Sequence, residues 1–240
     1  MNAMVLAAGL GTRLMPLTKT MPKCLMPIAG KPLLRHWLDA LNEVGIDECV
    51  INTHYLPDQV RDCVSRFESA LPISLVHEKT LLGTAGTLMA NIGRFRGDDV
   101  MIFHADNYCT ANIDLFIRAF NQRPDTCLMS MMTFMADDPS SAGIVTLDDK
   151  NIVVNFVEKP CHSEHRLANA AIYIFSAGML EILVNRFSDV KDISTELIPQ
   201  FLGKIHAHPC DGMVVDIGSL ERYEGLNNAL EQNLLATVET

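Results

Sequence analysis

Long apolar segments are missing from this sequence of 240 residues. The longest apolar run, around residues 129–136, is interrupted by Ser130 and Thr133 and is far too short to span a bilayer. No basic segment precedes the first apolar run, as a signal peptide would require. Internal repeats, low-complexity segments and linkers are missing as well. With 48% hydrophobic residues, the chain is therefore predicted to form one cytoplasmic domain over residues 1–240, without membrane association.

Paired cysteines and an excess of positive charge are also missing. The seven cysteines are odd in number and include no C-x-x-C pair, which excludes the usual disulfide frameworks and structural zinc sites and favours reduced thiols. The formal net charge of −10 argues against binding of nucleic acid or of a membrane surface.

Positive charge is concentrated at the beginning of the chain. Residues 1–38 contain no Asp or Glu and five basic residues, so the remaining residues carry a net charge of −15. A local excess of +5 on an acidic protein predicts a binding site for an anion. The five residues are Arg13, Lys19, Lys23, Lys31 and Arg35.

A glycine-containing turn lies inside this basic segment. The apolar run at residues 4–8 predicts a buried strand, and Gly9 and Gly11 allow a tight turn whose N–H groups can bind phosphate oxygens. Prolines at 16, 22, 27 and 32 predict a loop over residues 14–31. The pattern is neither a Walker loop nor a dinucleotide fingerprint, because Leu14 stands where the third glycine belongs. Taken alone, it is equally typical of an ordinary strand–helix turn.

Apolar strands and amphipathic helices alternate along the first half, and strands are more frequent in the second. This order predicts an α/β fold with a doubly wound, mostly parallel (mixed) sheet and a strand-rich lobe. Pro199 should kink or end its helix. Helices are expected at 32–44, 57–69, 83–92, 112–122, 177–187, 195–202 and 220–235, and strands at 48–53, 73–76, 100–105, 126–134, 144–147, 152–157, 170–175, 204–208 and 213–217.

Two aspartates follow short apolar runs, Asp106 after residues 100–103 and Asp216 after residues 213–215. Ligands of open α/β sheets bind beyond the carboxyl ends of the strands, and Mg²⁺ prefers one or two carboxylates together with phosphate oxygens and water. The pair is therefore a candidate Mg²⁺ site. Capping of a turn is the alternative that the sequence leaves open.

The string Leu6-Ala7-Ala8-Gly9-Leu10-Gly11-Thr12-Arg13, followed after nine intervening residues by Lys23, resembles the signature of the sugar-1-phosphate nucleotidyltransferases. Further motifs occur in the order found in that family, with Ala171 and Val214 in place of the usual Gly and Trp. They are Leu82-Gly83-Thr84-Ala85-Gly86, Asp106, Ala142-Gly143-Ile144-Val145, Val157-Glu158-Lys159-Pro160, Asn169-Ala170-Ala171-Ile172-Tyr173 and Asp216.

The resemblance implies a Rossmann-like, GT-A-like fold, with residues 1–135 binding a nucleoside triphosphate and residues 136–240 binding a sugar 1-phosphate. Arg13 and Lys23 would be catalytic, and Asp106 and Asp216 would hold Mg²⁺. Nucleotide-binding residues would be Leu6, Ala7, Ala8, Gly9, Gly11, Thr12, Gly83, Thr84 and Gly86. Sugar-phosphate-binding residues would be Gly143, Glu158, Lys159 and Asn169.

Within the family, L-G-T-A-G most resembles the members that transfer guanylyl groups to mannose or heptose 1-phosphates, so GTP is the expected nucleotide. Uridylyl or thymidylyl transfer to another sugar 1-phosphate, of the glucose or N-acetylmuramic acid type, is the alternative. A catalytically silent homologue that binds a nucleotide-sugar as a sensor is a second alternative. The short C-terminal end contains no repeat, so no acyltransferase solenoid is expected. Whether the chain forms a homo-oligomer is left open.

Overall fold

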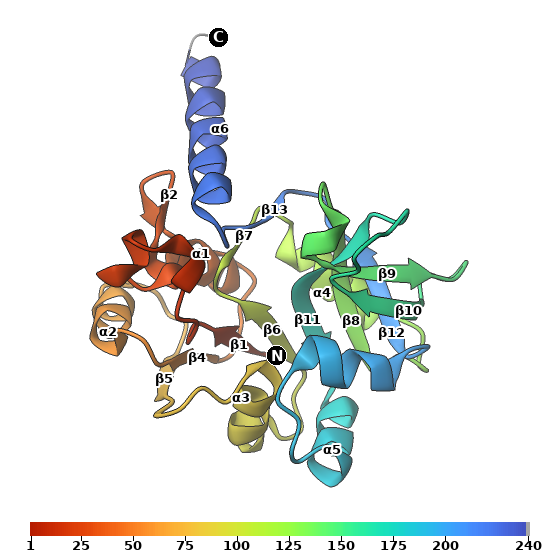
Figure 1. Ribbon diagram of the computed structural model, residues 1–240. Helices are drawn as coiled ribbons and strands as arrows, with labels where there is room; N and C mark the ends of the chain where they lie inside the picture. Colours follow the sequence, from red (N-terminus) through yellow and green to blue (C-terminus); the bar gives the residue numbers. More distant parts are fainter. Residues whose placement is uncertain (239–240) are drawn as a thin grey trace.

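The computed structural model describes the backbone of residues 1–238 and the side-chain surroundings of residues 1–232. Residues 239 and 240 of the predicted domain lie outside this range. The confirmed fold class is α/β, with a nine-stranded mixed sheet at the centre of the molecule (Figure 1). Among the described helices, none is both long and apolar enough to cross a membrane.

The first half of the chain builds the parallel part of this sheet. Strand β1 (Asn2–Leu6) lies between β4 (Cys49–Thr53) and β6 (Val100–His104), and β5 (Ile73–His77) pairs with β4. The chain runs outward from β1 to β4 and β5 and then returns to β6 on the other side of β1. The carboxyl ends of β1 and β6 therefore form a topological switch point, where ligands of open α/β sheets bind.

The second half extends the sheet beyond β6 with mostly antiparallel strands. Strand β11 (Leu167–Phe175) pairs antiparallel with β6, β8 (Met129–Met135) and β9 (Gly143–Leu147). Strand β10 (Val153–Glu158) pairs antiparallel with β9, and β12 (Ile205–Pro209) runs parallel to β8. The strand-rich lobe is thus continuous with the parallel part, because β6 and β11 are neighbours.

Helices cover both faces of the sheet. Alternating residues of β1 point to opposite faces: Ala3 and Val5 belong to one buried cluster and Met4 to the other. Helices α1 (Leu33–Glu43), α2 (Pro57–Ser65) and α4 (Ile113–Asn121) pack on the first face. Helices α3 (Thr84–Asn91) and α5 (Ala177–Arg186) pack on the second.

The last helix, α6 (Leu220–Val238), points away from the rest of the molecule (Figure 1). Its first turns are held by a small buried cluster that joins Leu226 to Leu14, Met26 and Ile217. The beginning of α6 is thereby fixed beside the basic N-terminal segment, although almost 200 residues separate the two in the sequence.

Several predicted boundaries are corrected. Helix α2 ends at Ser65, short of residue 69. The helix expected at 195–202 begins earlier, because the Asp192 side chain caps it by accepting a hydrogen bond from the Thr195 N–H. It consists of a π-helix over Ile193–Leu197 followed by a 3₁₀ helix over Ile198–Phe201. The helix type changes next to Pro199. The predicted loop at 14–31 contains 3₁₀ turns, Leu17–Lys19 and Lys23–Leu25, and a two-residue hairpin of β2 (Pro27–Ile28) with β3 (Lys31–Pro32).

Candidate active site

A two-stranded ribbon brings Asp106 and Asp216 together. Strand β7 (Asn107–Cys109), absent from the sequence prediction, begins directly after Asp106 and pairs with β13 (Val214–Asp216), so that Asp216 lies opposite Asn107. The Ile217 N–H also donates to the Asp106 carbonyl at 3.3 Å. Two residues 110 positions apart in the sequence thereby face one point beyond the end of β6.

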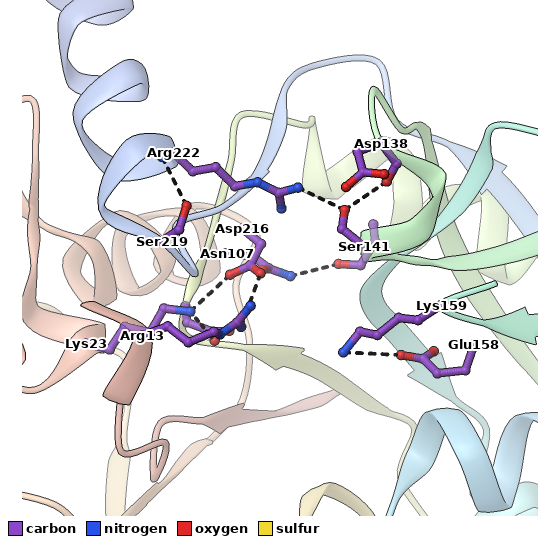
Figure 2. Close-up of polar contacts among 12 residues, drawn as sticks. Arg13, Lys23, Asn107, Asp138, Ser141, Glu158, Lys159, Asp216, Ser219 and Arg222 are labelled. Carbon is purple, nitrogen blue, oxygen red and sulfur yellow. Dashed lines mark hydrogen bonds and ion pairs between the residues drawn. The ribbon is translucent and has the colours of Figure 1, made fainter. Parts of the chain in front are cut away.

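Lys23 occupies that point. Its Nζ donates to Asp106 Oδ2 at 2.7 Å and to Asp216 Oδ1 at 3.0 Å, with the lysine side chain only 7% exposed (Figure 2). Burial alone would raise the pKa of Asp106, but the Lys23 ammonium and the neighbouring His104 outweigh it, so the pKa lies below its ordinary value. The structure therefore holds both carboxylates around a single positive centre.

Arg13 approaches the same point from the glycine turn. It lies on a 3₁₀ turn, Thr12–Leu14, and its Nη2 is 3.9 Å from Asp216 Oδ2, while its side chain remains 72% exposed. A Cβ at Gly218 would lie 2.7 Å from Asp216 Oδ2 and 2.9 Å from Arg13 Nη2, so glycine at 218 makes room for both groups. Arg13 is free to move toward an anion.

Hydrogen bonds to its neighbours fix the glycine turn. The Ala105 N–H donates to the Leu6 carbonyl at 3.0 Å, and the Ala7 N–H donates to Asn52 Oδ1 at 2.6 Å. Gly11 has φ of +64°, and a Cβ there would lie 2.9 Å from Thr18 Cγ2. A Cβ at Gly9 would meet no protein atom within 4 Å, so the space beside Gly9 is open to a ligand.

A cavity of about 210 Å³, here called the glycine-loop cavity, opens beside this turn. Three of the predicted nucleotide residues do not line it: Gly11, which packs against Thr18 and Lys23, the exposed Thr12, and Gly86, which faces Leu82 and the Val190 carbonyl. Predicted site residues that do line it are Leu6, Ala7, Ala8, Gly9, Lys23, Gly83, Thr84 and Asp106.

Gly83 and Thr84 also attach α3 to residues 191–193. Gly83 has φ of +81°, and a Cβ there would lie 2.4 Å from the Lys191 carbonyl oxygen. The Thr84 hydroxyl donates to Asp192 Oδ2 at 3.1 Å and accepts from the Ile193 N–H at 2.8 Å. These two residues thus have a packing role besides the predicted one.

Sequence reasoning missed a buried polar network at the back of this cavity. The Glu78 carboxylate accepts from Asn52 Nδ2 at 2.8 Å, from the Thr87 hydroxyl at 2.5 Å and from the Leu82 N–H at 3.1 Å. Asn52, Glu78 and Thr87 are each at most 6% exposed. Two of these residues could have been found from the sequence, because polar residues at strand ends indicate a ligand site. Asn52 comes directly after Val50-Ile51, and Glu78 follows the strand that contains Leu75-Val76.

A second cavity of about 380 Å³, here called the lobe cavity, adjoins the first at His104 and Asp106. Arg13 and Asp216 line it next to this junction. The four predicted sugar-phosphate residues line it as well: Gly143, Glu158, Lys159 and Asn169. The structure thus brings together motifs from β9, β10 and β11 in one hollow.

Glu158 carries an unused acceptor in this hollow. Its Oε2 is buried without a hydrogen-bond partner among the described residues, and Oε1 lies 3.7 Å from Lys159 Nζ. Burial raises the pKa of Glu158, although the Lys159 ammonium opposes the shift. A Cβ at Gly143 would lie 2.8 Å from Glu158 Oε2 and 2.5 Å from the Phe156 ring. Glycine at 143 therefore leaves room for the Glu158 carboxylate and the Phe156 ring.

Asn169 holds a bulge of β11 beside Glu158. Its Nδ2 donates to the Tyr173 hydroxyl at 2.7 Å, and its Oδ1 accepts from the Ala171 N–H at 2.9 Å. The register of β11 shifts between Asn169 and Tyr173, and Ala171 has φ of +55°. A left-handed residue explains why glycine is usual at this position of the motif.

The donor set around Lys23 fits a divalent cation. Two carboxylates, each 36% exposed, converge on one positive centre beside the lobe cavity. No group of three or more His, Cys, Asp or Glu side chains that could hold a metal occurs in the described part of the chain. A cation here would draw its remaining ligands from substrate phosphates and water, an arrangement typical of Mg²⁺.

The fold and this arrangement of residues define an α/β protein with a ligand site at the switch point of its sheet, and comparison with known proteins identifies the family. A family model described as nucleotidyl transferase matches residues 2–233. The chain belongs to this family.

Two curated relatives and one solved structure are similar to this chain. Mannose-1-phosphate guanylyltransferase catalytic subunit beta of Danio rerio is 31% identical over 91% of this chain and 61% of its own length. Glucose-1-phosphate thymidylyltransferase of Streptomyces griseus is 34% identical over 75% of this chain and 51% of its own length. The chain thus spans about three fifths or less of these relatives. The crystal structure of HddC from Yersinia pseudotuberculosis complexed with GMP-PN has a TM-score of 0.78 and 23% identity, covering 95% of this chain and 99% of that one.

Proposed function

We propose that this protein joins a nucleoside triphosphate to a sugar 1-phosphate, giving a nucleotide-sugar and pyrophosphate. The observation that carries the proposal is the position of Lys23, Asp106 and Asp216. They lie at the switch point between β1 and β6, where the glycine-loop cavity meets the lobe cavity. Two substrates placed in the two cavities meet at these residues.

The reaction needs alignment and charge neutralisation and no covalent protein intermediate. A phosphate oxygen of the sugar 1-phosphate attacks the α-phosphorus of the triphosphate, and the bond to the leaving pyrophosphate breaks on the opposite side. Lys23 and Arg13 are the cations placed to neutralise charge on the reacting phosphates. Mg²⁺, held by Asp106 and Asp216, would supply further positive charge that reduces the repulsion between the two substrates.

The lobe cavity supplies the contacts proposed for the sugar. The unpartnered Glu158 Oε2 is an acceptor for ring hydroxyl groups, and Lys159 carries a cation into the same hollow. Substituting Glu158 with alanine should raise the KM for sugar 1-phosphate much more than the KM for triphosphate. Equal increases for both substrates would assign Glu158 a purely structural role.

GTP is the nucleotide that we favour. The zebrafish relative is named a guanylyltransferase, and the HddC neighbour was solved with GMP-PN. The relative from Streptomyces griseus keeps thymidylyl transfer, and with it uridylyl transfer, as the second candidate.

A matrix of nucleoside triphosphates against sugar 1-phosphates, with Mg²⁺ and the product read by mass, tests both the reaction and the base. We expect a guanosine diphosphate sugar, with mannose or heptose 1-phosphate as acceptor. Asp106→Asn should greatly lower turnover at saturating Mg²⁺, assayed at a temperature at which the melting curve shows the variant to be folded. Absence of pyrophosphate release in every combination would favour a sensor that binds nucleotide-sugars without turning them over.

A further inference from the structure

One cation of the lobe cavity, Arg222, has no role in the reaction proposed above. Arg222 lies in the first turn of α6, six residues after Asp216, and its guanidinium lines the same hollow as Arg13, Lys159 and Asp216. Its Nη2 donates to Ser141 Oγ at 2.9 Å across the mouth of the cavity (Figure 2). Ser141 belongs to the 3₁₀ turn Pro139–Ser141, which leads into Gly143.

Arg222 differs from the other cations of the site in its counter-ion. Lys23 lies between two carboxylates, Arg13 faces Asp216, and Lys159 faces Glu158. Arg222 forms no ion pair within the part of the chain whose side chains are described, and its partner is a neutral hydroxyl group. A half-buried guanidinium with five donors and one neutral partner retains the capacity to bind an anion.

The nearest acidic loop does not remove that capacity. Asp138 precedes the turn that carries Ser141, and its carboxylate accepts from the Ser140 hydroxyl at 2.6 Å and the Ser140 N–H at 3.0 Å. Asp137 is paired with Arg166 at 3.1 Å. Neither carboxylate forms an ion pair with Arg222, although, besides the Ser140 hydrogen bonds, the Arg222 charge contributes to lowering the pKa of Asp138.

The anion that enters this hollow is the phosphate of the sugar substrate. A monoester phosphate carries a charge of about −1.5 to −2 at pH 7. Glu158, Asp106 and Asp216 line the cavity with negative charge, so an uncompensated cation is needed for a dianion to bind. We infer that Arg222 binds the phosphate group of the sugar 1-phosphate and exchanges its hydrogen bond to Ser141 for this contact. The inference rests on the function proposed above.

The experiment compares the two partners of one hydrogen bond. Arg222→Gln, Ser141→Ala and the control Arg186→Gln, an exposed arginine of α5, are assayed for the KM of the sugar 1-phosphate selected by the matrix and for the KM of the triphosphate. Calorimetric titration with α-D-mannose 1-phosphate and with free mannose is run in parallel on each variant.

If Arg222 binds the phosphate, Arg222→Gln raises the KM of sugar 1-phosphate about tenfold to a hundredfold and leaves that of the triphosphate within about twofold. Ser141→Ala leaves both unchanged or tightens sugar-phosphate binding, because it only frees the guanidinium. Arg222→Lys, which keeps the charge without the planar fork, gives an intermediate KM. Binding of free mannose is unaffected throughout.

Three results would overturn the inference. Equal weakening by Arg222→Gln and Ser141→Ala would make their contact a structural link across the cavity mouth. A parallel rise in the triphosphate KM would indicate general electrostatic attraction, and an unchanged KM in Arg222→Gln would exclude any contact. The proposed function fails separately, on the wild-type chain: no turnover in the matrix and no binding of any sugar 1-phosphate overturns both.

Discussion

At the scale of single residues, Lys23 is the best-defined feature of the site. It is almost completely buried, and its ammonium is held by two carboxylates that come from distant parts of the chain. A buried cation between two anions stabilises the fold only while all three charges are present, because loss of the cation leaves two facing carboxylates uncompensated.

Lys23→Met should therefore lower the free energy of unfolding at pH 7.5 by about 1–3 kcal/mol. This is less than for a fully buried pair, since both carboxylates are 36% exposed. The depressed pKa of Asp106 means that the wild-type pair stabilises the fold above the unfolded-state value of 3.8 and loses this effect only as pH falls through the lower folded-state value. In the variant Asp106 protonates more readily, so the difference in stability should be largest above about pH 5 and should narrow below it.

Thermal melting with and without Mg²⁺ measures this prediction. Added Mg²⁺ should recover part of the lost stability of Lys23→Met, and Lys19→Met, on the exposed side of the same segment, should melt like the wild type. A variant that melts normally would contradict the stabilising role of Lys23, and one whose melting does not respond to Mg²⁺ would contradict the proposal that Asp106 and Asp216 hold this cation.

Ala171 gives a second prediction at the residue scale. Its φ of +55° costs an alanine about 1–2 kcal/mol, whereas glycine adopts this conformation freely. Ala171→Gly should leave the free energy of unfolding unchanged or raise it by up to about 1 kcal/mol, because the relief of strain is partly offset by the greater conformational entropy of the unfolded chain. Ala170→Gly is the matched control, a buried neighbour without positive φ, and should destabilise by about 1–2 kcal/mol. Chemical denaturation of both variants measures these free energies of unfolding. Equal losses of stability in the two variants would mean that position 171 carries no strain.

At the scale of elements, the N-terminus of α3 is fixed by its contact with residues 191–193. Gly83 packs directly on the Lys191 carbonyl, and Thr84 bonds to Asp192 and Ile193. The short loop before α3 borders the glycine-loop cavity, so the contact also determines the shape of that cavity.

Gly83→Ala should destabilise the protein by at least about 2 kcal/mol, because a positive φ and a 2.4 Å approach to a backbone oxygen act together. Gly86→Ala provides the contrast: its Cβ would lie 3.3 Å from Leu82 Cβ, and alanine favours the helix, so the change should stay within about 1 kcal/mol. Urea midpoints and triphosphate KM of both variants test this. A silent Gly83→Ala would exclude the packing role.

At the scale of the whole molecule, charge is separated between the basic N-terminal segment and the rest of the chain. Two accounts of this segment differ in outcome: specific contacts by Arg13 and Lys23, or diffuse attraction of anions by all five cations. The structure separates them, since Arg13 and Lys23 line the cavities and Lys19 lines neither.

If contacts are specific, Arg13→Lys and Lys23→Ala should each lower kcat by about 10²-fold or more, because the lost interaction acts on the transition state. An ammonium at position 13 does not reproduce the planar two-pronged contact of guanidinium with phosphate. Lys19→Ala should affect only KM, and only at low salt. Full turnover in Arg13→Lys, together with equal effects of Lys19→Ala and Lys23→Ala at both salt concentrations, would leave only the diffuse account.

The sequence by itself determined the features that depend on local pattern. Apolar periodicity predicted the α/β fold class, and glycine and proline positions located the turn at Gly9–Gly11 and the irregular segment after it. Local patterns also indicated Asp106 and Asp216 as candidate ligands, since a polar residue that follows an apolar run can be recognised from the sequence alone. Helix boundaries near Asp192 and Ser65 were missed because capping and packing decide the last turn of a helix.

Only the tertiary structure decided which of these residues meet. The three-residue strand β7, too short to have a sequence signal, pairs with the predicted strand β13, and this pairing places Asp216 beside Asp106 so that both contact Lys23. The beginning of α6, fixed by the contact of Leu226 with the N-terminal segment, brings Arg222 to Ser141. Burial of Asn52, Glu78 and Thr87 against one another is likewise a property of three separate elements. Such long-range contacts depend on the order of the strands in the sheet and on which helices cover each face. The residue pattern of a single segment contains no information about either.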